Sequence, residues 1–283
     1  MGIDAKTLRF MMQSRSTASF ERVLTLGRQF THVSPADIER ELKPLGLPSS
    51  TVRPIAVHAR QSGFFEPIFE LMGASKVDSM DFSDYEQATI VHDINDPVAE
   101  TLKEKFTVVY DGGTLEHVFN FPIAIRNAME MVAVGGHYLC TTPTNNLSGH
   151  GFYQFSPDLI YRIFSESNGF EVEELCVAET RPHAPMYRIE DPMKLGHRVM
   201  FTNSYPVYLM ARARRIAKVP IFQTTPQQTY YETKWTGTGG AAAARESLRA
   251  WAKRSLPTPV KNVLRRFGPQ QVRPLDSSGF QKL

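Results

Sequence analysis

The chain of 283 residues is long enough for one large α/β domain with appendages or for two small domains, and we favour one domain. A hydrophobic fraction of 42% and a charged fraction of 22% are ordinary for a soluble globular protein and exclude wholesale disorder. The formal net charge of +3 is uneven, because the residues beyond 240 carry nine Lys or Arg against two acids, which gives them +7 and leaves −4 for the rest.

Short apolar runs alternate with helical patterns along the chain, which is typical of parallel strands joined by crossover helices. Seven strands are expected, at 22–27, 76–81, 88–96, 106–113, 137–143, 171–179 and 206–214. Helices are expected between them, at 34–46, 64–74, 121–136 and 156–170. The sequence therefore predicts an α/β protein with a Rossmann-like, seven-stranded, mostly parallel sheet and flanking helices.

Two segments depart from this alternation. Residues 180–204 form a long polar connection, and residues after Thr236 begin with a low-complexity hinge, "TGTGGAAAA". We expect a main domain at 1–236 and a basic appendage at 237–283. The appendage is expected to be partly helical, at about 241–254 and 259–267, with a loose end.

Membrane-spanning and disulfide-linked classes are excluded by the sequence. No apolar run approaches the roughly 20 residues of a membrane span, and the N-terminus lacks an unbroken apolar segment. Cys140 and Cys176 sit in apolar runs and are expected to be buried thiols in a reducing compartment. We therefore expect a cytoplasmic protein.

Chemistry-bearing residues follow the predicted strands. In an open parallel sheet, ligands bind outside the carboxyl ends of the strands, near the point where strand order reverses. The residues expected at those ends are Gly27, Arg28 and Gln29, then Asp81, then Asp93, then 111–117, and finally 143–150. Each acid also has a structural interpretation: Asp81 caps a turn, and Asp93 bonds its own backbone as an Asx-turn.

The order of motifs from 106 to 175 is distinctive. It runs "FTVVYDGGTLEHVFN", a helix, "VGGHYLCTTP" and "FYQFSPDLIYRIFSESNGFEVEEL". With the seven strands, this series resembles the class I S-adenosylmethionine-dependent methyltransferases, especially small-molecule members with an L-E-H-V turn after the fourth strand. The resemblance spans roughly residues 20–215.

The resemblance implies a binding site for S-adenosylmethionine. Asp81 would accept hydrogen bonds from the ribose hydroxyls, and Asp93 would lie by the adenine amino group. Four residues would line the methionine moiety: Asp111, Gly112, Gly113 and Thr114. The two glycines lack a Cβ and so permit close approach of the backbone to a ligand.

The first turn departs from the family pattern. The family's first strand ends in a G-x-G-x-G turn, whereas "LTLGRQF" offers only Gly27, and 53 residues separate Gly27 from Asp81. We therefore expect an insert at about 30–63. Either Arg28 and Gln29 replace the missing backbone contacts, with Arg28 pairing with the cofactor carboxylate, or the site has decayed and Arg28 forms a surface ion pair.

Two histidines are the candidate catalytic residues. His150, between glycines in "TPTNNLSGHGFYQFSPD", is placed either to take a proton from the methyl acceptor or to support its loop. His117 either forms the substrate side of the pocket or has a capping role. No group of His, Cys or acidic residues has the spacing of a zinc site, and neither a phosphate loop nor a nucleophile elbow is present.

These expectations leave two classes of function open. The first is methyl transfer from S-adenosylmethionine to an oxygen or nitrogen of a small molecule, glycan or lipid precursor. The second is a non-catalytic methyltransferase-like binding or scaffold protein, because fold alone does not fix function. The basic tail has few interleaved aromatic residues, which argues against nucleic acid. Its amphipathic pattern suits either peripheral contact with an anionic membrane or packing on the domain or a second subunit.

Overall fold

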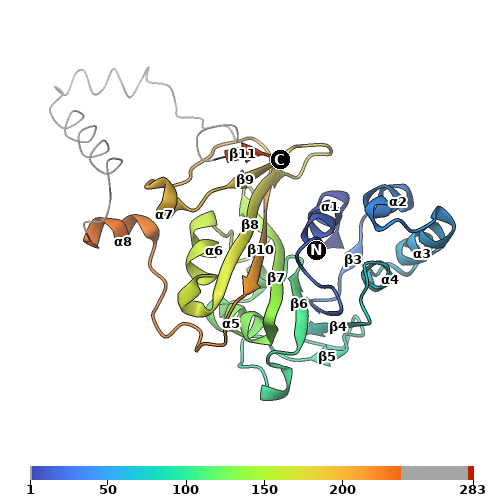
Figure 1. Ribbon diagram of the computed structural model, residues 1–283, viewed down its shortest axis with the longest axis horizontal. Helices are drawn as coiled ribbons and strands as arrows, with labels where there is room; N and C mark the ends of the chain where they lie inside the picture. The colour runs from blue at the N-terminus through green and yellow to red at the C-terminus, as the bar shows by residue number, and fades with distance from the viewer. Residues whose placement is uncertain (1, 237–279) are drawn as a thin grey trace.

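The computed structural model describes residues 2–236 and 280–283 and is built on one large sheet with helices on both faces (Figure 1). Within the described residues the sheet has nine strands, in the order β11-β9-β8-β10-β7-β6-β2-β4-β5. Their bounds are β2 Arg22–Leu26, β4 Lys76–Asp81, β5 Ile90–Val91, β6 Phe106–Asp111, β7 Val132–Asn145, β8 Phe170–Glu179, β9 Met186–Ile189, β10 Val207–Arg215 and β11 Phe280–Lys282. The predicted α/β class is confirmed, with nine strands in place of seven.

The strand order reverses at β2. The chain places β4 and β5 on one side of β2 and β6 and β7 on the other, all in parallel pairing. Leu26 at the end of β2 stands beside Met80 on one side and Asp111 on the other. The carboxyl ends of the neighbouring strands β2 and β6 therefore mark the switch point, where open α/β sheets bind ligands.

Side chains alternate between two apolar layers. On β6, Val108 and Tyr110 belong to the layer under α1–α4, and Val109 belongs to the layer under α5 and α6. Figure 1 shows the two groups of helices on opposite sides of the sheet. The bounds are α1 Ala5–Ser14, α2 Pro35–Leu42, α3 Ser49–Ser62, α4 Glu66–Leu71, α5 Phe121–Met131 and α6 Pro157–Ile163. Burial on both faces explains why these strands are continuous apolar runs.

Shorter elements complete the described fold. Parallel pairing of β1 (Gly2–Ile3) with β3 (Phe30–Thr31) makes a second, two-stranded sheet. Four single turns of 3₁₀ helix also occur: η1 Lys43–Leu45, η2 Glu100–Leu102, η3 Leu115–His117 and η4 Glu166–Asn168. The expected insert at 30–63 contains β3, α2, η1 and α3. Its first helix, expected from residue 34, is capped by Ser34, whose side chain accepts from the Asp37 amide.

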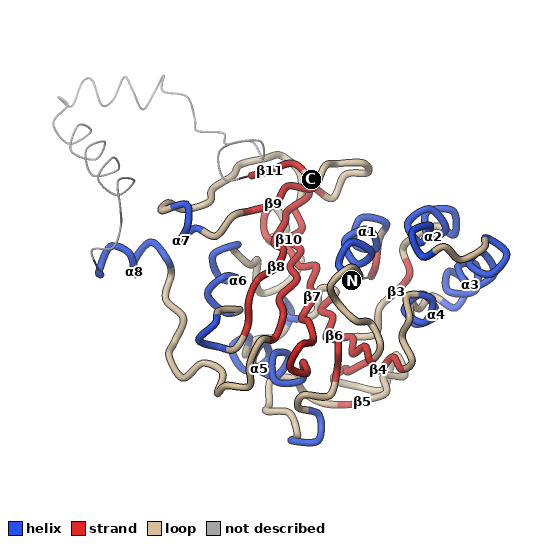
Figure 2. Tube along the Cα trace, viewed as in Figure 1, coloured by secondary structure: helices blue, strands red, loops and turns tan. Residues whose placement is uncertain are grey.

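Several sequence expectations are corrected by the structure. The helix expected to reach Gly136 ends at Met131, and Val132 already belongs to β7. A Cβ on Gly136 would lie 2.8 Å from the Thr107 carbonyl oxygen, so this glycine serves close strand packing and not a helix end. The connection at 180–204 holds β9 and α7 (Pro192–Leu195), as Figure 2 shows.

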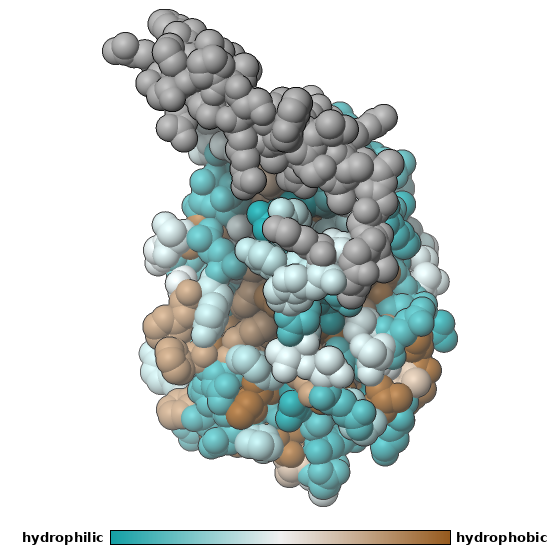
Figure 3. Space-filling model, turned by 90° about the vertical axis from the view of Figure 1, so that its left-hand side faces the viewer, coloured by the Kyte–Doolittle hydropathy of each residue, from teal (hydrophilic) through white to brown (hydrophobic). Residues whose placement is uncertain are grey.

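The end of the chain is a further correction. Phe280–Lys282, expected as a loose end, pairs antiparallel with β9 and extends the sheet. The helices expected at 241–254 and 259–267 lie outside the described residues. The face that carries α6, α7 and α8 (Thr229–Thr236) shows apolar patches between polar ones (Figure 3). Within 2–236 and 280–283, no helix has the length and apolar character needed to cross a bilayer.

Candidate functional site

A pocket of about 240 Å³ opens at the carboxyl ends of β2, β4 and β5 and beside the turn after β6. It brings together five of the predicted site residues, which the sequence placed at the ends of four separate strands: Gly27, Asp81, Asp93, Thr114 and His117. Its other lining residues are Leu26, Met80, Phe82, His92, Ile94, Asn95 and Val118. The pocket thus lies at the switch point of the sheet.

Gly27 makes the turn out of β2. Its φ of +68° is a left-handed conformation that glycine adopts without strain, and its amide donates to the Met80 carbonyl at 2.7 Å. Thr114 Oγ1 donates to the Leu26 carbonyl at 2.6 Å, and a Cβ on residue 27 would lie 2.9 Å from that hydroxyl. The turns after β2 and β6 are therefore in direct contact, and a side chain at 27 would force them apart.

The two acids of the pocket differ in their partners. Asp81 Oδ1 accepts from the Phe82 amide at 2.7 Å, and its Oδ2 accepts no hydrogen bond from any described residue. Asp93 Oδ1 accepts from the amide and side chain of Asn95, at 2.9 and 2.8 Å, which is the Asx-turn geometry. These two bonds lower the pKa of Asp93. Asp81 thus offers a free carboxylate oxygen at the strand end, and Asp93 both lines the pocket and holds its turn.

Asp111 lies beneath the pocket and does not line it. Its side chain is 1% exposed, and Oδ1 accepts from the amides of Gly113, Thr114 and Leu115, at 3.2, 2.8 and 3.4 Å. Oδ2 accepts from the Tyr138 hydroxyl at 3.1 Å. Burial raises the pKa of Asp111, and the three amides and the hydroxyl oppose that rise. In this structure the carboxylate orders the turn after β6.

Gln29 fills the space next to the predicted glycine pair. Its Nε2 donates to the carbonyls of Leu26 and Gly27, at 2.9 and 3.1 Å. A Cβ on Gly112 would lie 1.9 Å from Gln29 Oε1, so the close approach that this glycine permits is made by the protein's own side chain. Gln29 is 3% exposed, and its Oε1 has no partner among the described residues.

Arg28 turns away from the pocket. Its Nε lies 2.6 Å from Glu66 Oε1, its Nη1 donates to the Glu86 carbonyl at 2.9 Å, and its guanidinium stacks 3.6 Å from the Phe64 ring centroid. These partners tie the β2 turn to the start of α4. Arg28 would have to leave them in order to bind a cofactor carboxylate.

His117 and His150 meet at the mouth of the pocket, on either side of Glu116. The two imidazole rings are 4.9 Å apart, and His150 Nε2 faces Glu116 Oε1 at 3.4 Å. Burial raises the pKa of Glu116 to about 8, and the charge on Asp111 adds to this rise. Burial lowers the pKa of both histidines. The spacing in the sequence indicates no such cluster, because 32 residues lie between His117 and His150. The two histidines come together because they follow β6 and β7, which pair side by side.

Phe82 and Asn95 are pocket residues that the sequence analysis did not single out. Phe82 is 72% exposed and offers a ring face at the pocket, directly after Asp81. Its position one residue after the strand-end acid Asp81 was the feature of the sequence that could have identified it as a pocket residue. Asn95 anchors Asp93 and also accepts from the Asn120 amide at 2.9 Å, which ties the turn after β5 to the start of α5.

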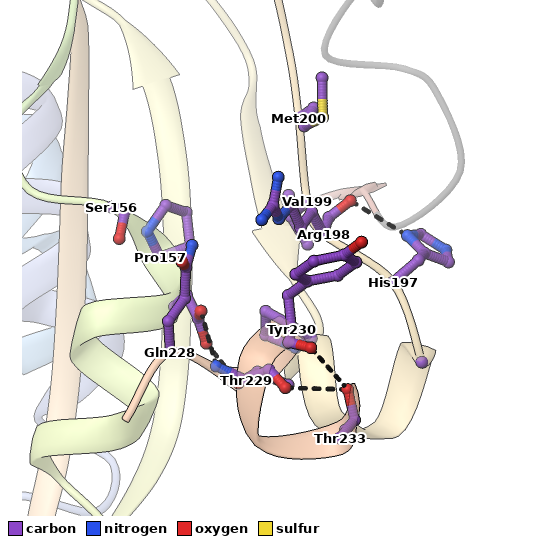
Figure 4. Close-up of a pocket in the computed structure, with 13 residues that line it drawn as sticks. Ser156, Pro157, His197, Arg198, Val199, Met200, Gln228, Thr229, Tyr230 and Thr233 are labelled. Carbon is purple, nitrogen blue, oxygen red and sulfur yellow. Dashed lines mark hydrogen bonds between the residues drawn. The ribbon is translucent and has the colours of Figure 1, made fainter. Parts of the chain in front are cut away.

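A second pocket, of about 110 Å³, lies between α6, α7 and α8 (Figure 4). Several of its polar groups have partners within the protein. Asp158 accepts from the amide and hydroxyl of Thr229, and the Arg198 guanidinium lies 3.9 Å from the Tyr230 ring centroid. These contacts fasten α8 to the domain, so the pocket at the strand ends is the better candidate for a functional site.

Comparison with known proteins gives low similarities. No protein-family model matches the chain, and no curated protein matches its sequence. Among solved structures, it is similar to an S-adenosylmethionine-dependent methyltransferase from Mesorhizobium loti, at 16% identity and a TM-score of 0.41, covering 75% of this chain and 98% of that one. It is also similar to the N-methyltransferase NodS from Bradyrhizobium japonicum, at 14% identity and a TM-score of 0.37, covering 75% and 93%.

A third similar structure is a variant of the branched-chain polyamine synthase from Thermus thermophilus, in complex with N4-aminopropylspermidine and 5'-methylthioadenosine. The identity is 11% and the TM-score 0.36, and the match covers 77% of this chain and 57% of the synthase. The chain therefore spans less than two thirds of that protein. Similarities at this level assign neither activity nor substrate.

Proposed function

We propose that the strand-end pocket binds the nucleoside part of S-adenosylmethionine and that the protein transfers its methyl group to an oxygen or nitrogen of a small molecule, glycan or lipid precursor. One observation carries the proposal: Asp81 presents an unpaired carboxylate oxygen at the switch point of the parallel part of the sheet, beside the glycine turn at Gly27. A carboxylate at that place suits the paired hydroxyls of a ribose.

The other lining residues fit the remainder of a nucleoside. The exposed ring of Phe82 offers a face on which a base can stack, and Asp93 Oδ2 accepts no hydrogen bond from the described residues, so it is free for an adenine amino group. Thr114 lies on the side toward β6, where the sulfur end of the cofactor would point. The cofactor would supply a methyl group on a cationic sulfonium, which is a good leaving group. Positioning of the acceptor therefore does most of the catalytic work.

His117 and His150 stand where an acceptor would enter. The lowered pKa of each favours the neutral imidazole near pH 7, and a neutral imidazole can take the proton that an attacking hydroxyl or amine gives up. His117 both lines the pocket and contacts the His150 ring, so the acceptor side is on the η3 side of the pocket.

A non-catalytic binding protein is the second candidate, and the first turn is the observation that favours it. Gln29 occupies the space beside Gly112, and Arg28 is engaged with Glu66. The methionine end of the cofactor therefore has room only if Gln29 changes its rotamer. A protein that kept the sheet and lost cofactor binding would show the same filled turn.

The test is a pair of matched substitutions, Asp81→Ala and Asp84→Ala, followed by titration with S-adenosylhomocysteine. Asp84 is an exposed acid three residues away that does not line the pocket. Hydrogen bonds to a charged group contribute about 1.5–3 kcal/mol each, so Asp81→Ala should weaken binding about tenfold or more. Asp84→Ala should leave it unchanged. Equal affinities in the two variants would remove Asp81 from the site and with it the proposed binding mode.

A further inference from the structure

Glu116, His117 and His150 form a cluster whose role the nucleoside pocket does not explain. One ligand atom from each, a carboxylate oxygen and two imidazole nitrogens, lies within 4.8 Å of the other two. Glu116 is completely buried, the His150 side chain is 29% exposed, and His117 is exposed. The cluster is therefore closed on the protein side and open on the solvent side.

Two of the three atoms are held at the spacing of metal ligands. His150 Nε2 and Glu116 Oε1 face each other at 3.4 Å without forming a hydrogen bond, and both are buried without a partner among the described residues. A tetrahedral cation about 2.1 Å from each ligand keeps its ligand atoms about 3.4 Å apart. A buried carboxylate oxygen left without a partner is costly, which a cation between the two residues would relieve.

The surrounding backbone fixes this geometry. The amides of Phe152 and Tyr153 donate to the Glu116 carbonyl at 2.8 and 3.1 Å, so the loop that carries His150 is fastened to the turn that carries Glu116. A Cβ on Gly151 would lie 2.8 Å from that carbonyl oxygen, which explains the glycine beside His150. Thr142 Oγ1 donates to Glu116 Oε2 at 3.4 Å and orients the carboxylate, as supporting hydrogen bonds do for metal ligands.

We propose that Glu116, His117 and His150 bind a divalent transition-metal cation at the mouth of the strand-end pocket. Two imidazoles and one carboxylate favour Zn²⁺ and its first-row neighbours over Mg²⁺ and Ca²⁺, which prefer oxygen ligands alone. Three protein ligands leave coordination positions free on the open side, as in catalytic zinc sites.

The free positions indicate what kind of acceptor the site would take, an inference that rests on the proposed methyl transfer. His117 also lines the pocket, so the cluster borders the proposed cofactor site. An acceptor with a hydroxyl or phenolic oxygen would complete the coordination of the cation and be held there. Imidazoles bound to a cation no longer act as bases, so in the cation-bound protein the cation, which lowers the pKa of the bound oxygen, would replace the base role proposed above for His117 and His150.

The test begins with the tag-free, full-length chain after removal of metal by chelator. Zn²⁺ is titrated calorimetrically, and Co²⁺ is titrated by its visible absorption, which reports a site with few ligands. The wild type should bind one equivalent. His117→Ala and His150→Ala should each weaken binding by more than about 100-fold, beyond the roughly 10–100-fold loss typical of a supporting residue. His58→Ala, which removes an exposed imidazole on α3, is the matched control and should bind as the wild type does.

Failure of the wild type to bind one equivalent of either cation would overturn the site, as would equal binding by the His58→Ala and His150→Ala variants. Either result would leave Glu116 and His150 as a metal-free carboxyl–imidazole pair. Circular dichroism of each variant checks the fold. Titration of the wild type with S-adenosylhomocysteine separates the two proposals: a wild type that binds the nucleoside and no metal contradicts the metal site alone, and a wild type that binds the metal and no nucleoside contradicts the proposed function alone.

Discussion

Gln29 shows how one residue can change the interpretation of a whole motif. From the sequence, Gly112 was expected to allow close approach of a ligand. In the structure a close approach is present, but the group that approaches is the Gln29 side-chain amide. The glycine therefore predicted that another group packs closely against the backbone at 112. Only the fold identifies that group as Gln29. Likewise, Asp111 was placed on the cofactor by resemblance, and its three amide partners show a carboxylate that also orders the turn.

The contact between Gln29 and Gly112 gives a prediction at this scale. Gly112→Ala would put a Cβ 1.9 Å from Gln29 Oε1 and 2.8 Å from Tyr110 Cε1. Overpacking of this kind should lower the free energy of unfolding by about 2 kcal/mol, measured by chemical denaturation. In a Gln29→Ala background the same change should cost less, since the amide is gone. An equal cost in both backgrounds would show that Gln29 does not set the crowding.

At the scale of elements, the sequence predicted the strands that position the site better than the ends of the helices. The runs at 22–27 and 106–113 were found because strands buried on both faces are largely apolar segments. The run at 76–81 holds only Val77 and Met80 as apolar residues and was interpreted as a strand ending in an acid. The third strand shrank to Ile90–Val91, and α5 stopped five residues early. The end of α5 depends on Arg215, which lies more than 80 residues later in the chain, so no local pattern could indicate it.

Arg215 on β10 is expected to stabilise the end of α5. Its Nη1 donates to the carbonyls of Met129, Glu130 and Val132, at 3.4, 3.1 and 2.6 Å, and its Nη2 lies 3.2 Å from Glu104. The carbonyls of Met129 and Glu130 also accept from the amides of Val132 and Glu104. Arg215→Met would remove the three guanidinium bonds and the buried partner of Glu104, and should lower the free energy of unfolding by about 3 kcal/mol.

Arg214→Met is the matched control for that change. Arg214 is the neighbouring residue on β10, its side chain is 48% exposed, and its one ion pair, with Glu171, is 3.8 Å long. A surface pair contributes about 0–1 kcal/mol, so the midpoint of denaturation should hardly move. Similar losses in both variants would mean that the carbonyls at the end of α5 do not need Arg215.

At the scale of the molecule, the described residues form the sheet, the strand-end pocket and the neighbouring cluster. What can be said of the basic segment beyond Thr236 comes from its sequence alone. We propose that this segment contacts anionic membranes, with each Lys or Arg near the headgroups contributing about 1 kcal/mol. The full chain should then co-sediment with anionic vesicles at low salt, and a chain that ends at Thr236 should not. Equal sedimentation of the two would favour packing of the tail on the domain or on a second subunit.

The central claim is that the pocket at the switch point binds an S-adenosyl nucleoside, and calorimetric titration of the full-length chain with S-adenosylmethionine and S-adenosylhomocysteine tests it most directly. The account predicts one binding site for each ligand and a rise in thermal stability that grows with ligand concentration, since a ligand that binds only the folded state stabilises it. Absence of heat and of any thermal shift with both ligands would contradict the claim and leave the filled turn at Gln29 as the mark of a non-catalytic protein.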